Sequence, residues 1–232
     1  MYNKNFITKL QKQASEFLQS KYLYVHGVAI YLKEIEVYYF EQGVFEDYTV
    51  HKNELQANNK YKFYVHRYGQ GKDSKYISGT RGGCDLVLSA SNEVYYSYLI
   101  RSVVINGELI VGPRKALNAI LERTGLSYED LENEYVEIKH IERGCDVLMT
   151  TRIGLGFSNN HYDHIYQEAE LRCIVCDKYF KMRDKDNVGY PKRTEAIDNF
   201  LKRKLEAGEM TKEQAINYSK QWYGAVSQWL KD

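Results

Sequence analysis

The sequence has little proline and cysteine and lacks long apolar segments. Its 232 residues include two prolines and four cysteines, and no apolar run approaches the roughly 18 residues of a membrane-spanning helix. Near the N-terminus, Asn3, Lys4, Gln11 and Lys12 interrupt any apolar segment typical of a secretory signal. These absences argue against a membrane or secreted protein. With so few cysteines, we expect reduced thiols and a cytoplasmic location.

Signatures of common cofactor-dependent and serine-dependent enzymes are also missing. The sequence has no Walker loop, no dinucleotide-binding fingerprint and no serine-triad signature, and we expect no cofactor. His161-x-x-His164 and Cys173-x-x-Cys176 contain zinc-capable residue types. Residues i and i+3 of a strand face opposite ways, however, so we expect two buried, reduced cysteines and no metal. A zinc site is the alternative interpretation.

Charge is nearly balanced overall but unevenly distributed. The net charge is +1, whereas residues 60–83 and 178–204 each carry a net +5 and residues 128–142 a net −5. Segregation of this kind permits a basic face for nucleic acid on a nearly neutral protein, and ordinary solvated surface is the alternative. Tyrosine is abundant, with 22 residues, and tyrosine rings can stack on bases.

Turn residues and apolar patterning divide the chain into a strand-rich part and a helical tail. Asn106-Gly107 is typical of a hairpin turn and Pro113 of the first turn of a helix. The pattern changes near Pro191, so we expect residues 1–190 to form one α+β domain and residues 191–232 a helical extension that packs on it. Strands are predicted at residues 22–30, 33–40, 61–68, 95–105, 109–111, 136–141 and 171–180, and helices at 5–20, from 113 to near 125, from about 127, at 192–206 and at 212–230.

The tail carries large aromatic side chains at helical spacing. Tyr218, Trp222 and Trp229 fall near one helical face, and Thr211 and Gln214 fit a capping box. We expect this face to pack on the body of the protein. The alternative is a surface for a partner or for nucleic acid.

The strand at residues 33–40 has two chemically different faces. Alternation places Ile35 and Val37 on one face and Glu36 and Tyr38 on the other. A carboxylate on an apolar strand is costly to bury unless it is paired or used. Two interpretations follow from the spacing: an edge strand with its glutamates in water, or a general base beside an aromatic wall. The spacing alone leaves both open.

Six short motifs follow one another along residues 8–182. In chain order they are Glu34-Ile-Glu36-Val-Tyr38, His51, Phe63-Tyr64-Val65-His66, Leu99-Ile100-Arg101, Gly112-Pro113-Arg-Lys-Ala-Leu and Arg152-Ile153-Gly154. This order resembles the alkyladenine (3-methyladenine) DNA glycosylase family. The resemblance implies an α+β fold with a mixed, mainly antiparallel curved β core flanked by helices. It also implies a monofunctional DNA glycosylase that acts without a cofactor.

The resemblance implies a catalytic centre at Glu36. That carboxylate would deprotonate the water that attacks the sugar C1′, Arg101 would help to hold the water, and backbone groups at Ile153 and Gly154 would complete its cradle. Arg101 also interrupts an apolar strand, so we expect its guanidinium to be paired across the sheet with Glu36. A carboxylate with an arginine partner can orient a water and stabilise an oxocarbenium-like centre.

The resemblance also implies a base pocket and a DNA partner. Tyr38 and His51 would flank a flipped-out base, and Tyr64 or Tyr76 would stack on its other face. The expected partner is double-stranded DNA, bound by a monomer in base-excision repair or in attack on modified foreign DNA, with nucleoid association. A non-catalytic nucleic-acid or nucleobase-binding module on the same fold is the alternative. The expected DNA contacts are Lys62, Arg67, Lys72, Lys75, Arg81 and Arg114.

Overall fold

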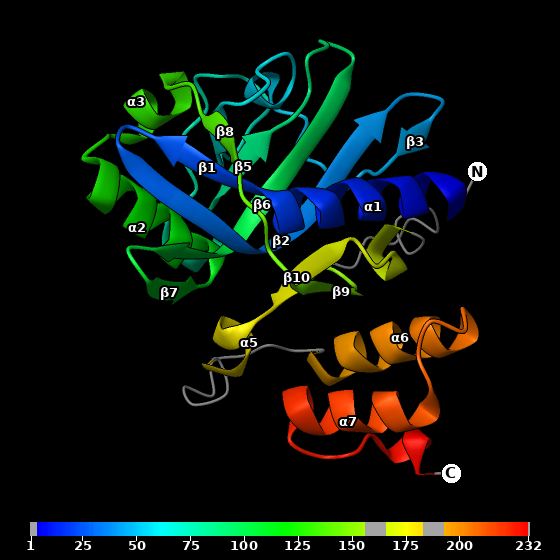
Figure 1. Ribbon diagram of the computed structural model, residues 1–232. Helices are drawn as coiled ribbons and strands as arrows, with labels where there is room; N and C mark the ends of the chain where they lie inside the picture. The colour runs from blue at the N-terminus through cyan, green and yellow to red at the C-terminus, as the bar shows by residue number, and fades with distance from the viewer. Residues whose placement is uncertain (1–3, 156–165, 183–192, 232) are drawn as a thin grey trace.

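The computed structural model describes residues 4–155, 166–182 and 193–231 (Figure 1). The strands are β1 (Lys21–Val25), β2 (Val28–Glu41), β3 (Phe45–Glu46), β4 (Phe63–Val65), β5 (Cys84–Val87), β6 (Val94–Ile105), β7 (Glu108–Val111), β8 (Glu137–His140), β9 (Asp146–Thr150) and β10 (Arg172–Cys176). The helices are α1 (Lys4–Ser20), α2 (Pro113–Thr124), α3 (Tyr128–Asn133), α5 (Lys178–Met182), α6 (Arg193–Glu206) and α7 (Lys212–Tyr223), with short 3-10 turns at Glu54–Gln56, Gly79–Arg81 and Gln228–Leu230.

Strand β2 is the centre of a single antiparallel sheet. It pairs with β1, β3, β6 and β10 along its length, and the main path of the sheet runs β4-β5-β6-β2-β1-β8. At Glu36 the two neighbours are Leu99 of β6 and Arg172 of β10. The interpretation of residues 33–40 as an edge strand with solvated glutamates is therefore wrong.

The sheet is curled. The two ends of its main path come together where Lys62 and Tyr135 form an isolated bridge, and the Val136 N–H donates to the Tyr61 carbonyl at 2.8 Å. This closure bends the strands into a half-barrel. The expectation of an α+β protein with a curved, antiparallel β core is confirmed at this level.

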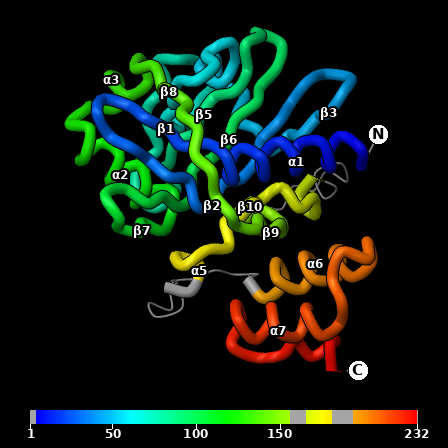
Figure 2. The backbone as a smooth tube through the Cα atoms, in the orientation of Figure 1, coloured from blue at the N-terminus to red at the C-terminus, as the bar shows by residue number. Residues whose placement is uncertain are grey.

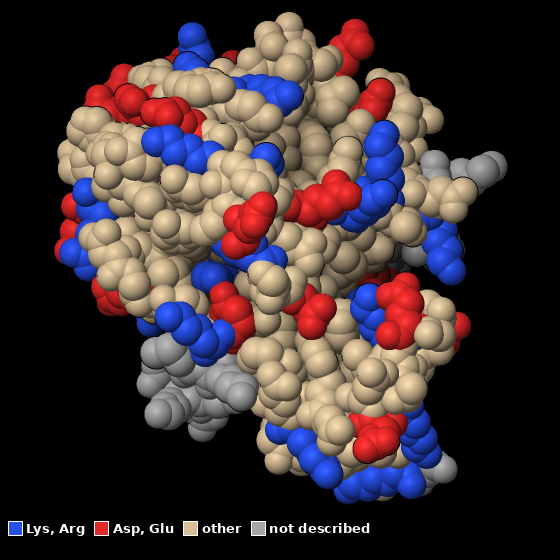
Figure 3. Space-filling model, viewed as in Figure 1, with Lys and Arg blue, Asp and Glu red and all other residues tan. Residues whose placement is uncertain are grey.

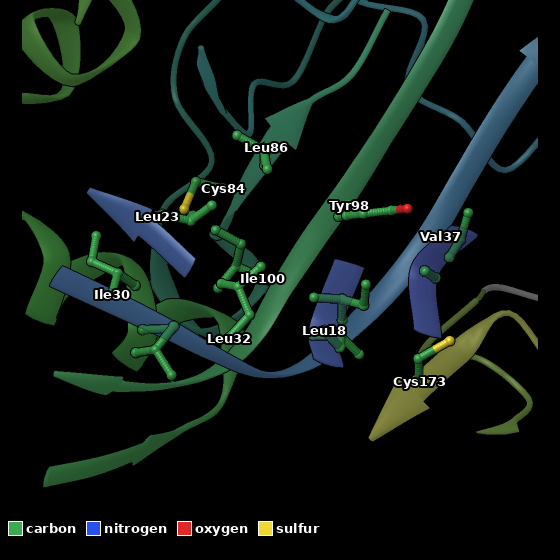
Figure 4. Close-up of a cluster of buried hydrophobic side chains, with 14 of the residues drawn as sticks. Leu18, Leu23, Ile30, Leu32, Val37, Cys84, Leu86, Tyr98, Ile100 and Cys173 are labelled. Atoms are coloured by element: carbon green, nitrogen blue, oxygen red, sulfur yellow. The ribbon is translucent and has the colours of Figure 1, made fainter. Parts of the chain in front are cut away.

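Helix α1 covers one face of the sheet. Its residues Ile7, Leu10, Ala14 and Leu18 recur every three or four positions, so they form one apolar stripe. The stripe belongs to a core that also contains inward-facing residues of β1, β2, β5, β6 and β10, several of which are drawn in Figure 4 together with Leu18. Helix α2 buries Leu117 and neighbouring residues in the same core. The apolar face of β2 predicted from alternation is confirmed.

The tail helices cover part of the opposite face. Leu148 of β9 and Ile174 of β10 point away from α1 into a second core, which contains Ile197, Phe200 and Leu201 of α6. Figures 1 and 2 show α6 and α7 lying beneath β9 and β10. Strands β9 and β10 are therefore covered on both faces. Side chains of α6 pack against Leu148 and Ile174 in this second core.

The two cysteines of β10 face opposite ways. Cys173 belongs to the α1 core and Cys176 to the tail core, and both are buried thiols outside any disulfide. His161 and His164 lie outside the described residues. Among the residues that the structure describes, no cluster of metal-ligating side chains is found. No helix in the same part of the chain is long and apolar enough to cross a membrane.

Several predicted boundaries differ from the structure. The strand predicted at 22–30 is a hairpin that turns at His26-Gly27. The strand predicted at 171–180 ends at Cys176, because the Asp177 side chain accepts the Tyr179 N–H and starts helix α5. Helix α7 ends at Tyr223 and not at residue 230, since Gly224 adopts a left-handed C-cap with φ of 84°.

Candidate functional site

Polar residues form a row across the face of the sheet opposite α1. Residues paired across adjacent strands share a face, and successive pairing joins Tyr64, Asp85, Leu99, Glu36 and Arg172. Four of the five are polar and lie in the interior of the protein. Burying polar groups costs free energy unless they are paired or used, whereas an apolar face carries no such cost. This row is therefore a candidate functional site.

Glu36 is fully buried and held by three donors. Its Oε1 accepts the Ile153 N–H at 2.8 Å and lies 3.1 Å from Arg101 Nη1, and its Oε2 accepts the Tyr38 hydroxyl at 3.2 Å. The expected pairing of Arg101 with Glu36 is confirmed. A carboxylate offers about four acceptor positions, so one remains that no described residue fills. Burial, the Glu36 charge and other nearby groups raise the pKa of Tyr38 well above its usual range, which keeps its hydroxyl protonated.

A β-bulge places Arg101 between two carboxylates. Ile35 pairs with Ile100 and Glu34 with Ser102, so Arg101 is an extra residue in β6. Its Nε lies 3.1 Å from Glu34 Oε1, while Ser102 donates to Glu34 Oε2 at 2.8 Å. Bulges re-aim side chains in this way beside functional sites. Arg101 therefore bridges Glu34 and Glu36.

A cavity of about 610 Å³ opens beside Glu36. Tyr38, Arg101 and Ile153 line it on one side of Leu99, and His66 and Asp85 line it on the other. Glu36 lies directly behind the wall, since all three of its donors are lining residues. The cavity thus has a carboxylate–arginine pair at one end and a histidine–carboxylate pair at the other.

A buried ion pair holds the loop that carries His51. Arg152 Nη1 lies 2.6 Å from Asp47 Oδ2, and both side chains are inaccessible to solvent. Asp47 also accepts the Thr49 N–H at 3.0 Å, which fixes the turn leading to His51. The Arg152 guanidinium lies 4.6 Å from the Tyr38 ring centroid. One arginine therefore positions two walls of the cavity.

His66 and Asp85 form a second polar pair that the sequence did not single out as a site. His66 Nε2 lies 2.7 Å from Asp85 Oδ1, and Asp85 Oδ2 accepts from Gln56 at 2.9 Å and Ser97 at 2.8 Å. Burial alone would raise the pKa of the Asp85 carboxyl. The neighbouring His66 and the hydrogen bonds from His66 and Ser97 outweigh burial and hold this pKa below its usual range.

The predicted pocket aromatics are only partly brought together. Tyr38 and His51 line the cavity. Tyr64 is fully buried with its hydroxyl 3.4 Å from His51 Nδ1, so it stands behind His51. Tyr76 lies outside the cavity wall and donates to Glu132 at 2.9 Å. Neither Tyr64 nor Tyr76 reaches a position from which it could stack on a ligand in the cavity.

The six basic residues predicted to contact DNA are dispersed. Arg67 forms an ion pair with Glu132 and donates to the Tyr76 hydroxyl at 2.7 Å, so its guanidinium is already occupied. Lys62 is half-buried beside a strand bridge, Arg114 is half-buried at the start of α2, and Lys72 and Lys75 are exposed on a loop. Arg81 is exposed and reaches the cavity rim.

Gly82 allows the 79–83 segment to approach α2. A Cβ at Gly82 would lie 2.5 Å from Arg114 Nη1 and 2.8 Å from the Ile77 carbonyl. This close packing brings Arg81 and Pro113 to the same side of the cavity. Gly82 and Gly83 therefore shape the wall, and a larger side chain at either position would meet neighbouring atoms.

Surface charge on the α1 side is mixed. Figure 3 shows Lys and Arg side chains interspersed with Asp and Glu over this face, with acidic residues gathered near α3. No basic field dominates this view. The basic residues that line the cavity are Arg81 and Arg101, on the other face of the sheet.

No protein-family model matches the sequence, and a search of curated proteins finds no match either. Fold and site together define an α+β protein whose curled antiparallel sheet carries a buried carboxylate–arginine centre. That centre lies at the wall of a pocket that also contains a histidine–aspartate pair.

Proposed function

We propose that the protein is a monofunctional DNA glycosylase that hydrolyses the N-glycosidic bond of a flipped-out damaged or modified base. The observation that carries the proposal is the fully buried Glu36, ion-paired to Arg101 behind the wall of a 610 Å³ cavity. Ligand pockets have volumes of roughly 300–1,000 Å³. The motif order that resembles the alkyladenine DNA glycosylases supports the same reaction.

The burial of Glu36 favours a functional role over a structural one. An apolar pair of similar volume would stabilise a sheet as well as a buried ion pair does. The stabilising ion-pair network is already supplied by Glu34, which contacts both Arg101 and Arg172. Glu36 differs because its donors Tyr38 and Ile153 belong to the cavity wall.

The geometry supports a water activated at Tyr38. Glu36 has no exposed surface, whereas its partners Tyr38 and Arg101 both line the cavity. A water bound to these two groups passes a proton to the Tyr38 oxygen as Tyr38 passes its own to Glu36 Oε2. The water oxygen bonds to C1′, and the electrons of the broken N-glycosidic bond leave with the base. The negative charge of Glu36 stabilises the oxocarbenium-like centre.

The base would be read in the space between the two polar ends of the cavity. A base inside a duplex is unreachable, so it must be extruded from the stack. Tyr38 and His51 offer ring surfaces, and the Ile153–Gly154 turn offers backbone groups. Double-stranded DNA is the proposed partner of a monomer, with base excision in repair or in defence against modified DNA as the setting.

Glu36→Gln tests the proposal directly. Oligonucleotides bearing different modified bases are incubated with the protein, and abasic sites are then cleaved with alkali. We expect the variant to lose about 10²–10⁴ in rate, the usual effect of removing a general base, while DNA binding and folding persist. Glu132→Gln is the matched control, because Glu132 is also buried and ion-paired but contacts Arg67 outside the cavity.

The alternative function is a binding module that grips a nucleobase without cleaving it. The complete burial of Glu36 favours this alternative, since no cavity water touches the carboxylate directly unless a side chain moves. Wild-type protein that binds a modified oligonucleotide, yet yields no abasic sites with any base, would establish the binder and refute the enzyme.

A further inference from the structure

We propose that the side-chain amide of Gln56 recognises the base in the cavity, so that the site takes bases with a carbonyl group, and not an amino group, at the edge remote from the sugar. This inference rests on the proposed function, in which a flipped-out base enters the cavity. Gln56 lines the cavity and is buried, with 2% of its surface exposed. Its hydrogen bonds lie apart from the water-activating centre at Glu36.

Two hydrogen bonds fix the orientation of the Gln56 amide. Its Oε1 accepts the Asn53 N–H at 3.2 Å, and its Nε2 donates to Asp85 Oδ2 at 2.9 Å. An ionised carboxylate only accepts hydrogen bonds and a backbone N–H only donates them. Turning the amide over would place oxygen against oxygen at Asp85 and N–H against N–H at Asn53. The amide nitrogen is therefore held in one position.

The helix cap alone does not explain why this residue carries an amide nitrogen. Asn53 and Gln56 form a capping box around the Glu54–Gln56 turn, and a glutamate serves at this place in a capping box as well as a glutamine does. An amide nitrogen carries two N–H groups, of which one bonds Asp85. The second has no acceptor among the residues that the structure describes. Buried polar groups nearly always have a partner, so this N–H is left for a ligand.

Gln56 stands at the end of the cavity away from Glu36. Its partner Asp85 on β5 pairs with Leu99 of β6, and Leu99 pairs on its other side with Glu36 of β2. Neighbouring strands are about 4.8 Å apart, so the backbones of Asp85 and Glu36 are roughly 10 Å apart. With the sugar at the Glu36 end, the edge of the base remote from the sugar lies nearest to Gln56.

The unused N–H of Gln56 selects for a hydrogen-bond acceptor. A ligand that fills this end of the cavity displaces the water there, and its nearest atom must accept the N–H or leave a buried donor unpaired. A ring carbonyl accepts, whereas an exocyclic amino group presents N–H to N–H. The held amide cannot turn to accommodate the amino group.

Oxo bases such as hypoxanthine and uracil are therefore expected to fit, and bases with an amino group in the same place, such as adenine and cytosine, to be rejected. The base 3-methyladenine carries that amino group and should be rejected as well. On this point the chain would differ from the family that its motif order resembles.

The test measures the affinity of the wild-type protein for free hypoxanthine and free adenine by isothermal titration calorimetry. Hypoxanthine should bind about tenfold or more tightly than adenine, the scale expected when a buried donor is left unpaired. Because only wild-type protein is needed, this measurement does not depend on the folding of a variant. Equal affinities, or no binding of either base, would overturn the proposed role of Gln56.

Gln56→Met assigns the preference to the amide, since methionine has a similar length and no N–H. Its affinity for hypoxanthine should fall about tenfold and its affinity for adenine should change by less than about threefold. Gln167→Met, at another glutamine of the cavity wall, is the matched control and should leave the ratio of the two affinities unchanged. A preference for hypoxanthine that persists in Gln56→Met would overturn the proposal.

Excision from an oligonucleotide with hypoxanthine separates this inference from the proposed function. Preferential binding of hypoxanthine without abasic sites from any modified oligonucleotide would refute the glycosylase and leave Gln56 as the recognition residue of a binding module. Excision that Gln56→Met does not slow, together with equal affinities for the two free bases, would overturn the role of Gln56 and leave the glycosylase standing.

Discussion

Two glutamates on β2 show how neighbouring residues of one type acquire different roles. Glu34 contacts Arg101, Ser102 and Arg172 and lies in a buried charge cluster. Glu36 shares only Arg101 with that cluster, and its remaining donors face the cavity. The chemistry of the site is decided by the surroundings of each carboxylate and not by residue type.

Tyr38→Phe tests the proposed path from water to Glu36. The ring should stay packed against the Arg152 guanidinium, 4.6 Å away, so folding should be unchanged. Excision should slow about 10²-fold, because the hydroxyl that relays the proton is gone. Tyr39→Phe is the control, since that hydroxyl bonds Glu41 and not Glu36. The excision rate of each variant is measured by single-turnover kinetics. A wild-type rate in Tyr38→Phe would mean that Glu36 contacts the water directly, without a relay through Tyr38.

The acid stability of the protein should depend on Asp85. Its folded-state pKa lies below the unfolded value of about 3.9. Ionised Asp85 therefore stabilises the fold above about pH 3.9, and this contribution is lost as pH falls through the folded-state pKa. Urea unfolding from pH 7 to pH 3 should show the stability gap between wild type and Asp85→Asn narrowing only below about pH 4. Asp73→Asn, on an exposed loop, should differ little from wild type across the range.

At the scale of elements, the alternation of residue types along a strand predicted which side chains share a face of the sheet, but not which strands become neighbours. The apolar and polar sides of β2 followed from its sequence, as did α1, α2, the 106–107 hairpin and the two tail helices. The pairing of Arg101 with Glu36 followed from a charge in an apolar strand. The β-bulge that orients Arg101 could not be predicted from the sequence, since the pairing register of β6 depends on which strands become its neighbours.

The residues that were missed depend on contacts between distant segments. His66 and Asp85 lie 19 positions apart and meet only because β4 pairs with β5. Strand β9 was missed because Val147 and Leu148 face different cores, so the strand has no alternation to detect. The stacking role of Tyr64 was implied by the family resemblance, and the burial of Tyr64 behind His51 argues against it.

The Asp47–Arg152 pair is the contact that joins the His51 loop to β9. Arg152→Met should destabilise the fold by about 3–5 kcal/mol, because Asp47 would remain buried without a counter-charge. Asp47→Asn combined with Arg152→Met should recover part of that loss, measured by urea denaturation. The exposed pair Arg123–Glu108 is the control, where Arg123→Met should change stability by about 1 kcal/mol or less. Equal losses at both pairs would mean that the buried pair does not hold the loop.

At the scale of the molecule, the sheet serves two cores and one pocket. Helix α1 covers one face throughout the central strands, while the other face is divided between the cavity and the tail helices. Thr150, next to Arg172 in the polar row, donates to Glu195 of α6 at 3.2 Å. The tail therefore closes the β9–β10 end of the face that carries the site, and α7 lies one layer further out (Figure 1).

That arrangement predicts that the outer tail helix stabilises the fold without entering the reaction. Trp222 of α7 packs edge-on against Phe180, with ring centroids 6.1 Å apart, and is half-buried. Trp222→Ala should lower the free energy of unfolding by about 2–4 kcal/mol, somewhat below the usual effect at a fully buried aromatic. Excision per folded molecule should hold, because Trp222 packs against the tail core and does not line the cavity. Tyr223→Ala, at the exposed neighbouring side chain, should change stability by about 0.5 kcal/mol or less. Unchanged thermal stability with lost DNA binding in Trp222→Ala would instead make α7 a stacking surface for nucleic acid, and the tail would then belong to the site.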